Sequence, residues 1–183
     1  TLSNAKQAFN QAFFSTFGMQ PTDSGVSSIS ADDMKKFLED TLEPMFTGSD
    51  WTSNWSSASD DTMTSRIGKN EVVQTSTSAN SNGFRYFGLT SVIGSELMAG
   101  NFSNETRNAM IAKATEYSGL AVSGINDERT QLGLSQERVK NANTSLAAQK
   151  DIIDTQFGSL TGVDAYEAST KINNLQSLIE TSY

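Results

Sequence analysis

A heptad series of apolar residues in the C-terminal half constrains the fold more than any other feature of the sequence. Its members lie seven residues apart, with one interruption at Ser118: Ile111, Ile125, Leu132, Val139, Leu146, Ile153 and Leu160. An apolar residue at every seventh position marks the edge along which one α-helix packs on another. The series predicts one long helix over residues 104–158, longer than about 60 Å at a rise of 1.5 Å per residue, with these residues as its helix packing seam.

A second edge of this helix is small or polar. It consists of the residues four positions before the later seam members: Ala121, Glu128, Ser135, Ala142 and Gln149. The glycines Gly119, Gly124 and Gly133 each cost about 1 kcal/mol relative to alanine in a helix interior. Such a helix is held by packing or by the close approach of a neighbour. The pattern alone leaves open whether the seam packs within one chain or between protomers.

A last helix is expected over residues 164–183. Asp164 and Glu167 have the spacing of an N-cap and its N3 partner, and Val163 with Ala168 has the spacing of a hydrophobic staple. The apolar stripe consists of Ala168, Ile172, Leu175 and Ile179. Because the connection is short, we expect this helix to fold back antiparallel beside the long helix. Its pattern has no stop signal, so we expect it to continue in a longer parent chain.

The N-terminal part has shorter elements. Helical spacing predicts helices over residues 4–18, 30–48 and 84–98, the second opened by Ser30 with Asp33 three residues later. Residues 63–67 and 72–78 read as two strands of a β-hairpin. The predicted class is α+β, mainly α: a long antiparallel helical rod with additional helices and a small β-hairpin element. We expect residues 1–100 to form an outer part and residues 101–183 a two-helix rod.

Composition excludes several functions. The chain has no Cys and no His, which removes thiol nucleophiles, imidazole bases and the usual ligands of zinc. Its net charge of −8 argues against nucleic acid and anionic membranes as partners. Apolar runs are too short to span a membrane, and no secretory leader is visible. We therefore expect no enzyme activity, no cofactor, no metal site and no small-molecule substrate.

Three weaker patterns could indicate a functional site, but for each we prefer a structural explanation. The pairs at residues 32–33 and 60–61 are adjacent carboxylates of the kind that glycosidases use, but one pair fits a helix cap and the other a solvated loop. A calcium site with Asp50 lacks the twelve-residue loop pattern. Trp51 and Trp55 could stack on a sugar, but at this spacing they are expected to anchor a loop on a small core.

Residues 125–183 resemble the C-terminal arm of the flagellin superfamily. The resemblance rests on RTQLG at residues 129–133, QER at 136–138, GVDAYEAST at 162–170 and IETSY at 179–183. The residues that match the shared motifs are Leu132, Gly133, Gln136, Arg138, Tyr166, Ala168, Thr170 and Tyr183. The last two stretches, with DWTSNW at 50–55 and MTSRI at 63–67, look most like the hook-associated proteins of the hook–filament junction, of alphaproteobacterial type.

This resemblance implies a structural subunit of the bacterial flagellum that joins hook to filament by self-assembly and hetero-assembly. Its partners would be other copies of itself, the adjoining hook-associated protein, flagellin and an export chaperone. It would lie outside the cell at the hook–filament junction, exported through the flagellar type III apparatus without a cleaved signal peptide. Two alternatives stay open: a filament-forming flagellin, and a surface adhesin or glycan-binding module on a helical stalk.

Overall fold

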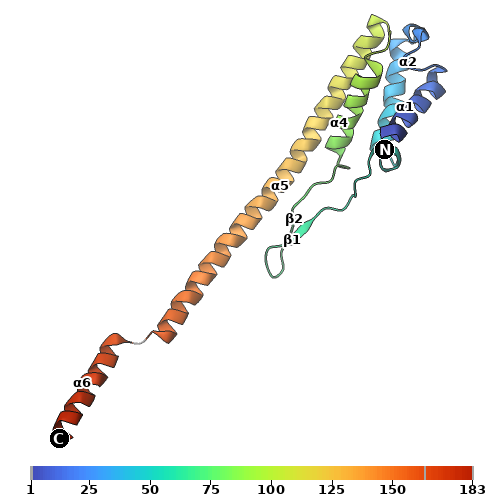
Figure 1. The fold of residues 1–183 in the computed structure, drawn as a ribbon. Helices are drawn as coiled ribbons and strands as arrows, with labels where there is room; N and C mark the ends of the chain where they lie inside the picture. Colours follow the sequence, from blue (N-terminus) through green and yellow to red (C-terminus); the bar gives the residue numbers. More distant parts are fainter. Residues whose placement is uncertain (1, 163, 183) are drawn as a thin grey trace. The chain divides into compact units, whose positions relative to one another are not determined.

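A computed structural model describes residues 2–162 and 164–182 (Figure 1). The elements in chain order are α1 (Leu2–Phe17), η1 (Ser24–Ser28), α2 (Ala31–Lys36), η2 (Phe37–Leu42), α3 (Glu43–Thr47), η3 (Trp51–Trp55), β1 (Thr64–Arg66), β2 (Val72–Gln74), α4 (Asn82–Val92), η4 (Ile93–Leu97), α5 (Asn104–Thr161) and α6 (Ala165–Ser182). Here η1 is a 3₁₀-helix, and η2, η3 and η4 are π-helical. The predicted class is confirmed: the described chain is mostly helical, with one long helix and a two-stranded antiparallel hairpin.

The chain divides into two compact units, Thr1–Arg138 and Val139–Tyr183. The division falls inside α5, which at 58 residues is the longest helix of the described chain and runs unbroken through Gly133. The expected organisation into an outer part over residues 1–100 and a rod over 101–183 stays a prediction. The two units are described separately below.

The first unit has an up-down-up-down arrangement of helices (Figure 1). Helix α1 leads to a turn at Gly18, and α2, η2 and α3 return in the opposite direction. Helix α4 with η4 then runs alongside the first part of α5, to which a second tight turn connects it. Such an arrangement lets each helix bury one apolar face in a shared core.

Local sequence explains where the first helices begin and end. The predicted stop at Gly18 is confirmed, because this glycine has φ +71° and its amide donates to the carbonyl of Phe14 at 2.7 Å. The predicted cap at Ser30 is also confirmed: its hydroxyl oxygen accepts from the amide of Asp33 and donates to the Asp33 carboxylate. The predicted helix over residues 30–48 widens into the π-helical η2 just before Pro44, which cannot donate to the preceding turn.

Phenylalanines dominate the core of the first unit. The rings of Phe9 and Phe13 are fully buried, and the Phe13 ring lies 5.4 Å from that of Phe37, edge to face. Aromatic pairs in this geometry stabilise beyond the area they bury. The other core residues come from the helices before α5, from two of their connections and from the first part of α5: Val26, Ile29, Met34, Leu38, Leu42, Met45, Phe46, Trp51, Leu89, Ile93, Leu97, Phe102, Met110 and Tyr117.

Helices α4 and α5 approach each other most closely at a pair of glycines. A Cβ on Gly83 would lie 2.5 Å from the backbone nitrogen of Ile125, and a Cβ on Gly124 would lie 2.7 Å from the Cα of Gly83. No real Cβ tolerates such distances, so both positions require glycine. Close approach by a neighbour, expected for the interior glycines of α5, is therefore found at Gly124. Gly119 and Gly133 have no such neighbour within 4 Å.

The hairpin is shorter than its sequence pattern suggested. Strands β1 and β2 pair antiparallel, with Ser65 opposite Val73, and only Val73 is buried. The Thr77 hydroxyl, just after β2, donates to the Glu128 carboxylate on α5. The hairpin is thus attached to α5 at its base, and within its two strands the residues other than Val73 are exposed or partly covered.

The expected antiparallel packing of residues 164–183 beside the long helix is wrong for the described residues. Helix α6 contains no buried residue, and among its described side chains only Ala168 is partly covered. The rule that short connections bring helices side by side applies to helices that share a core, and this segment has none. The expected staple involves Val163, which lies outside the described residues.

The glycine contact gives a prediction with a matched control. Gly124→Ala should lower the free energy of unfolding of the first unit by about 1–3 kcal/mol, because α4 has to shift. Gly119→Ala, on the same helix with open space around it, should raise it by up to about 1 kcal/mol through helix propensity. Fluorescence of the two tryptophans during thermal unfolding measures both. Equal shifts of the same sign would contradict the close approach.

Candidate functional site: the C-terminal helices and their anchorage

A hydroxyl–carboxylate cluster anchors the beginning of α5 to the other helices. The Tyr117 hydroxyl donates to Glu43 Oε2 at 2.9 Å and lies 3.3 Å from the carbonyl oxygen of Leu38. The Tyr86 hydroxyl on α4 donates to the other oxygen, Glu43 Oε1, at 2.9 Å. The two tyrosine rings stack with centroids 5.9 Å apart. One carboxylate of α3 therefore ties together α4 and α5.

A lysine on the same face of α5 forms a second tie. Lys113 is buried, and its Nζ lies 2.6 Å from Glu39 Oε1 of η2 and 2.8 Å from Glu116 Oε2 of α5. The ammonium also lies 5.5 Å from the centre of the Tyr117 ring. Its pairing with two carboxylates is what allows a charged group to remain in this position.

The titration behaviour of these groups indicates a structural role. Burial and the hydrogen bond to Glu43 raise the pKa of Tyr117 above that of an ordinary tyrosine, and the same causes raise the pKa of Tyr86. Hydrogen bonds to Glu116 and Glu39 raise the pKa of Lys113. The hydrogen bond from Lys113 lowers the pKa of Glu39. All four groups keep their usual protonation states at neutral pH, so none is adjusted to act as a base or nucleophile.

The loop after α3 is organised by Asn80. Its Oδ1 accepts from Trp51 Nε1 at 2.7 Å and from the Ser56 hydroxyl at 2.6 Å. Its Nδ2 donates to the Ala58 carbonyl at 2.9 Å and to Asp60 Oδ1 at 2.8 Å. All hydrogen-bonding capacity of this buried amide is thus used within the chain.

The two tryptophans pack on the core rather than form a binding platform. Trp51 is buried, and its ring centre lies 5.7 Å from that of Phe46. Trp55 is partly buried, and its ring centre lies 4.2 Å from that of Phe46. Arg85 lies over Trp51 and donates to the Thr47 carbonyl at 3.0 Å, at the end of α3. The expected role of the pair as anchors of a loop agrees with these contacts.

The carboxylate pairs have structural partners. The Asp33 carboxylate accepts from the hydroxyl of Ser30, the N-cap of α2, and the Asp60 carboxylate accepts from Asn80 Nδ2. Within residues 2–162 and 164–182, no cluster of three or more potential ligand side chains could hold a metal ion. None of the helices in the same residues combines the length and apolar character that crossing a bilayer requires.

In the first unit the buried face of α5 is shifted by one residue from the predicted seam, toward the N-terminus. Ile111 is 52% exposed, whereas Met110 and Tyr117 are buried. The buried face of this part of α5 consists of Thr106, Met110, Lys113, Tyr117 and Ala121. Further along, Ile125 and Leu132 are partly covered. Two of the five buried positions are polar, which is why the apolar pattern alone placed the face incorrectly at this end.

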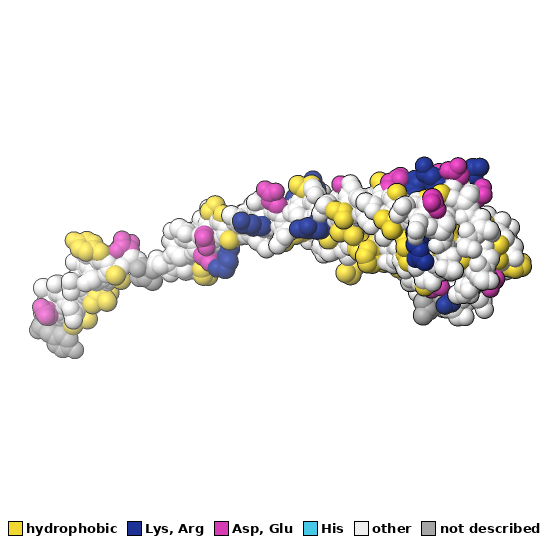
Figure 2. All heavy atoms as spheres, turned by 90° about the horizontal axis from the view of Figure 1, so that it is seen from above, with side chains coloured by type: hydrophobic (Ala, Val, Ile, Leu, Met, Phe, Trp, Pro, Cys, Tyr) yellow, Lys and Arg dark blue, Asp and Glu magenta, His cyan; other side chains and the backbone are white. Residues whose placement is uncertain are grey.

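In the second unit the seam becomes progressively uncovered. Val139 is partly covered, but Leu146 is 56%, Ile153 is 63% and Leu160 is 86% exposed. Phe157 is exposed beside them, between Ile153 and Leu160 on one face of the helix. Figure 2 shows apolar side chains on the surface of this helical part of the chain.

Helix α6 presents a second uncovered stripe. Its start is capped by Asp164, whose Oδ1 accepts from the amides of Tyr166 at 2.9 Å and Glu167 at 3.3 Å. The Glu167 carboxylate in turn pairs with Lys171 at 2.8 Å. The exposed apolar residues of α6 are Ile172, Leu175, Leu178 and Ile179. A helix with one apolar face normally buries it, so this face indicates a packing partner.

The residues of the family motifs lie on these same helices. Leu132 is partly covered, and Gly133, Gln136 and Arg138 are exposed on α5. On α6, Tyr166 is 83% exposed and the Thr170 hydroxyl donates to its carbonyl at 2.8 Å. Ala168 is partly covered, and Tyr183 lies outside the described residues.

Comparison with known proteins agrees with the resemblance for this part of the chain. Residues 115–183 match the family model of the bacterial flagellin C-terminal helical region. Searches of curated proteins and of solved structures each gave no match. The matched segment contains α5 from residue 115 onward, with the exposed seam residues from Leu146 to Leu160, and all of α6. Flagellins are structural proteins rather than enzymes.

Sequence reasoning missed the residues that anchor α5 and the residue that organises the loop after α3. Glu43, Lys113 and Asn80 are polar residues in buried or partly buried positions, and their partners lie far away in sequence. No local periodicity identifies such residues. A signal was present at Lys113 and Tyr117, because both continue the helical spacing of Met110 and Ala121.

The cluster around Glu43 gives a second prediction. Tyr117→Phe should destabilise the first unit by about 1–3 kcal/mol, because it leaves a partly buried oxygen of the Glu43 carboxylate without its donor. Tyr86→Phe removes the same type of hydroxyl from a less buried position, where water can replace it, and should cost less. Urea unfolding followed by tryptophan fluorescence gives both values. An equal loss in the two variants would contradict the role assigned to Tyr117.

Proposed function

We propose that this chain is part of a structural subunit of the bacterial flagellum, and that it works at the hook–filament junction. The subunit joins hook to filament by contacts with copies of itself, with the adjoining hook-associated protein and with flagellin. It acts outside the cell after type III export, which an export chaperone assists. The single observation that carries the proposal is the uncovered apolar seam within the segment that matches the flagellin C-terminal region.

The energetic argument starts from the exposed seam. Each exposed leucine or isoleucine forgoes on the order of 1.5–3 kcal/mol that burial would provide. The described part of the second unit offers Leu146, Ile153 and Leu160 on α5, and α6 offers a further stripe. A seam that continues for several heptads is suited to another long helix. In an assembled tube, helices of the parent chain and of neighbouring subunits provide that partner.

The role of the individual seam residues is part of this proposal. We assign Ile125, Leu132, Val139, Leu146, Ile153 and Leu160 to contacts with such a helix. Ile111, at the other end of the series, faces away from the core of the first unit and is available to the same partner. Asp164 and Glu167 are assigned to fixing where α6 begins, so that its apolar stripe keeps a defined register.

The choice of the junction rests on motif detail. The stretches GVDAYEAST and IETSY, together with DWTSNW near Trp51, look more like junction proteins than like filament subunits. The matched family model favours a second candidate, a filament-forming flagellin, because that model represents the flagellin C-terminal region as such. Both candidates use the same seam and differ in where the subunit sits.

Immunogold electron microscopy of intact flagella separates the two candidates. Antibodies raised against the first unit should label one point, where hook and filament meet. A filament subunit would instead be labelled along the whole filament. Antibodies against flagellin serve as the control for access to the filament. Labelling along the filament would replace the junction role by the flagellin role, and no labelling of flagella would contradict both.

A further inference from the structure

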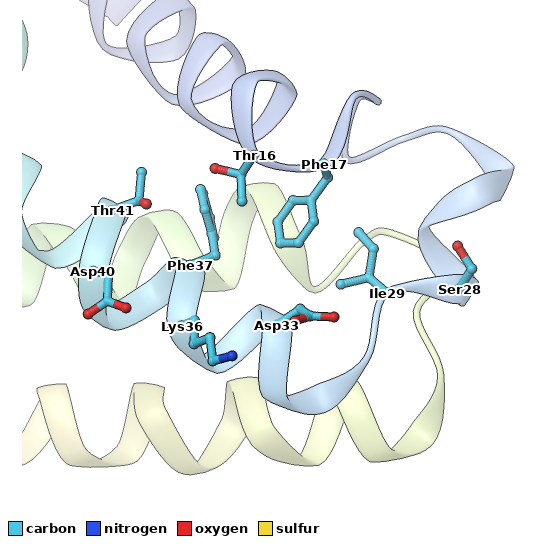
Figure 3. A pocket seen from close by; sticks show the side chains of 9 residues that line it. All are labelled: Thr16, Phe17, Ser28, Ile29, Asp33, Lys36, Phe37, Asp40 and Thr41. Atoms are coloured by element: carbon cyan, nitrogen blue, oxygen red, sulfur yellow. The ribbon is translucent and has the colours of Figure 1, made fainter.

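An open groove with an aromatic wall and an acidic rim lies on the first unit, beside the end of α1 (Figure 3). It has a volume of about 460 Å³ and is formed by α1, the segment after η1, α2 and η2. Phe17, Ile29 and Phe37 line its apolar part, and the exposed side chains of Asp33, Lys36 and Asp40 border it.

The groove has the chemistry of a receptor for a long cationic side chain. The Phe37 ring is buried in the floor of the groove, so an alkyl stem can lie against the partly exposed ring of Phe17 while its charged head reaches a carboxylate. Asp40 makes no ion pair within residues 2–162 and 164–182. Asp33 uses one carboxylate oxygen for the cap at Ser30, which leaves the other free for a cation. With two carboxylates and one lysine, the rim has a negative net charge.

The tip of the β-hairpin has the complementary net charge, because it carries two cations and one carboxylate, that of the exposed Glu71. Arg66 and Lys69 are both exposed, and neither makes an ion pair in the described chain. Arg66 Nη1 donates to the carbonyl of Lys69 at 2.9 Å and so holds the tip in a defined shape. Lys69 is exposed in the turn between β1 and β2, and the narrow hairpin protrudes from the helices (Figure 1), which suits insertion into a groove.

The two features lie at different ends of the first unit. The hairpin extends beyond the N-terminal end of α1, whereas the groove lies beside its C-terminal end (Figures 1 and 3). A contact between hairpin tip and groove therefore joins two copies rather than two parts of one copy. Such a contact is head-to-tail, and repeated head-to-tail contacts produce rings or helical arrays.

We propose that the hairpin tip of one copy docks in the Phe17–Phe37 groove of a second copy, with Lys69 paired to Asp40 and Asp33. The inference rests on the proposed function in that it names one contact of the same assembly. The contact is small, so by itself it is weak, and it reinforces contacts made by the C-terminal helices. We expect two copies of the isolated chain to form this contact at high protein concentration.

Zero-length cross-linking tests the contact directly. A carbodiimide joins a lysine amine to a carboxylate that touches it. Unlabelled and ¹⁵N-labelled copies of residues 1–183 are mixed at high concentration, treated and analysed by mass spectrometry. The expected product is a peptide pair that joins Lys69 to Asp40 or Asp33 and contains one labelled and one unlabelled partner. Mixed-isotope pairs that join the groove carboxylates to another segment, or no such pairs, would overturn the proposal.

Charge reversal provides the second arm. Lys69→Glu and Asp40→Lys should each weaken self-association, measured by sedimentation, several-fold, and the double variant should restore it. Lys140→Glu makes the same charge change at an exposed site on α5 and should leave association unchanged. Equal weakening by Lys140→Glu, or no restoration in the double variant, would overturn the contact. The proposed flagellar role is judged by gold labelling and can stand if this contact fails.

Discussion

The packing of the first part of α5 against the earlier helices is the constraint on which the first unit depends. Thr106 donates to the Ile29 carbonyl at 2.8 Å, Lys113 pairs with Glu39, and Tyr117 binds Glu43. Further along, the glycine contact brings α4 to the same helix, and Glu128 holds the base of the hairpin. The segment after η1, the helices η2, α3 and α4, and the hairpin thus each reach α5 through a specific contact.

The same helix then continues without a core around it. Its seam is partly covered at Ile125, Leu132 and Val139 and is exposed from Leu146 onward. A helix that packs on a core with its first part, and keeps an uncovered apolar seam on its later part, is suited to bind a partner with that later part. This property is what a subunit of a polymer needs, because the polymer contact must not be satisfied before assembly. The match to the flagellin C-terminal region covers this part of α5 and all of α6.

Much of the fold could be predicted because it follows from local chemistry. The long helix follows from its heptads, the start of α2 from Ser30 and the end of α1 from Gly18. The hairpin follows from two β-prone runs around a turn. Sequence reasoning failed where a residue's role depends on a distant partner. The bond from Thr106 to Ile29 spans 77 residues, and Asn80 serves a loop that begins 29 residues earlier.

The sequence could predict which helices carry the candidate site, but not which of its residues are covered by other parts of the chain. The heptad series predicts the seam residues, but at the start of α5 the buried residues are Met110 and Tyr117 rather than Ile111. The series also does not reveal which of its members find a partner within the chain. The packing face at the start of α5 contains a lysine and a threonine, so its apolar signal is weaker than that of the exposed seam. The antiparallel position expected for α6 failed for a related reason: an apolar stripe shows that a helix needs a partner, not which partner it has.

Hydrogen–deuterium exchange of the isolated chain and of the parent protein in intact flagella tests the central claim most directly. In the isolated chain at low concentration, amides of residues 106–121 should exchange slowly, because the helix is held there by the core of the first unit. Amides of residues 146–160 and of α6 should exchange much faster. In intact flagella the same two segments should become as protected as residues 106–121. Equal protection in the isolated chain, or no gain of protection in flagella, would contradict the claim that the seam is reserved for assembly.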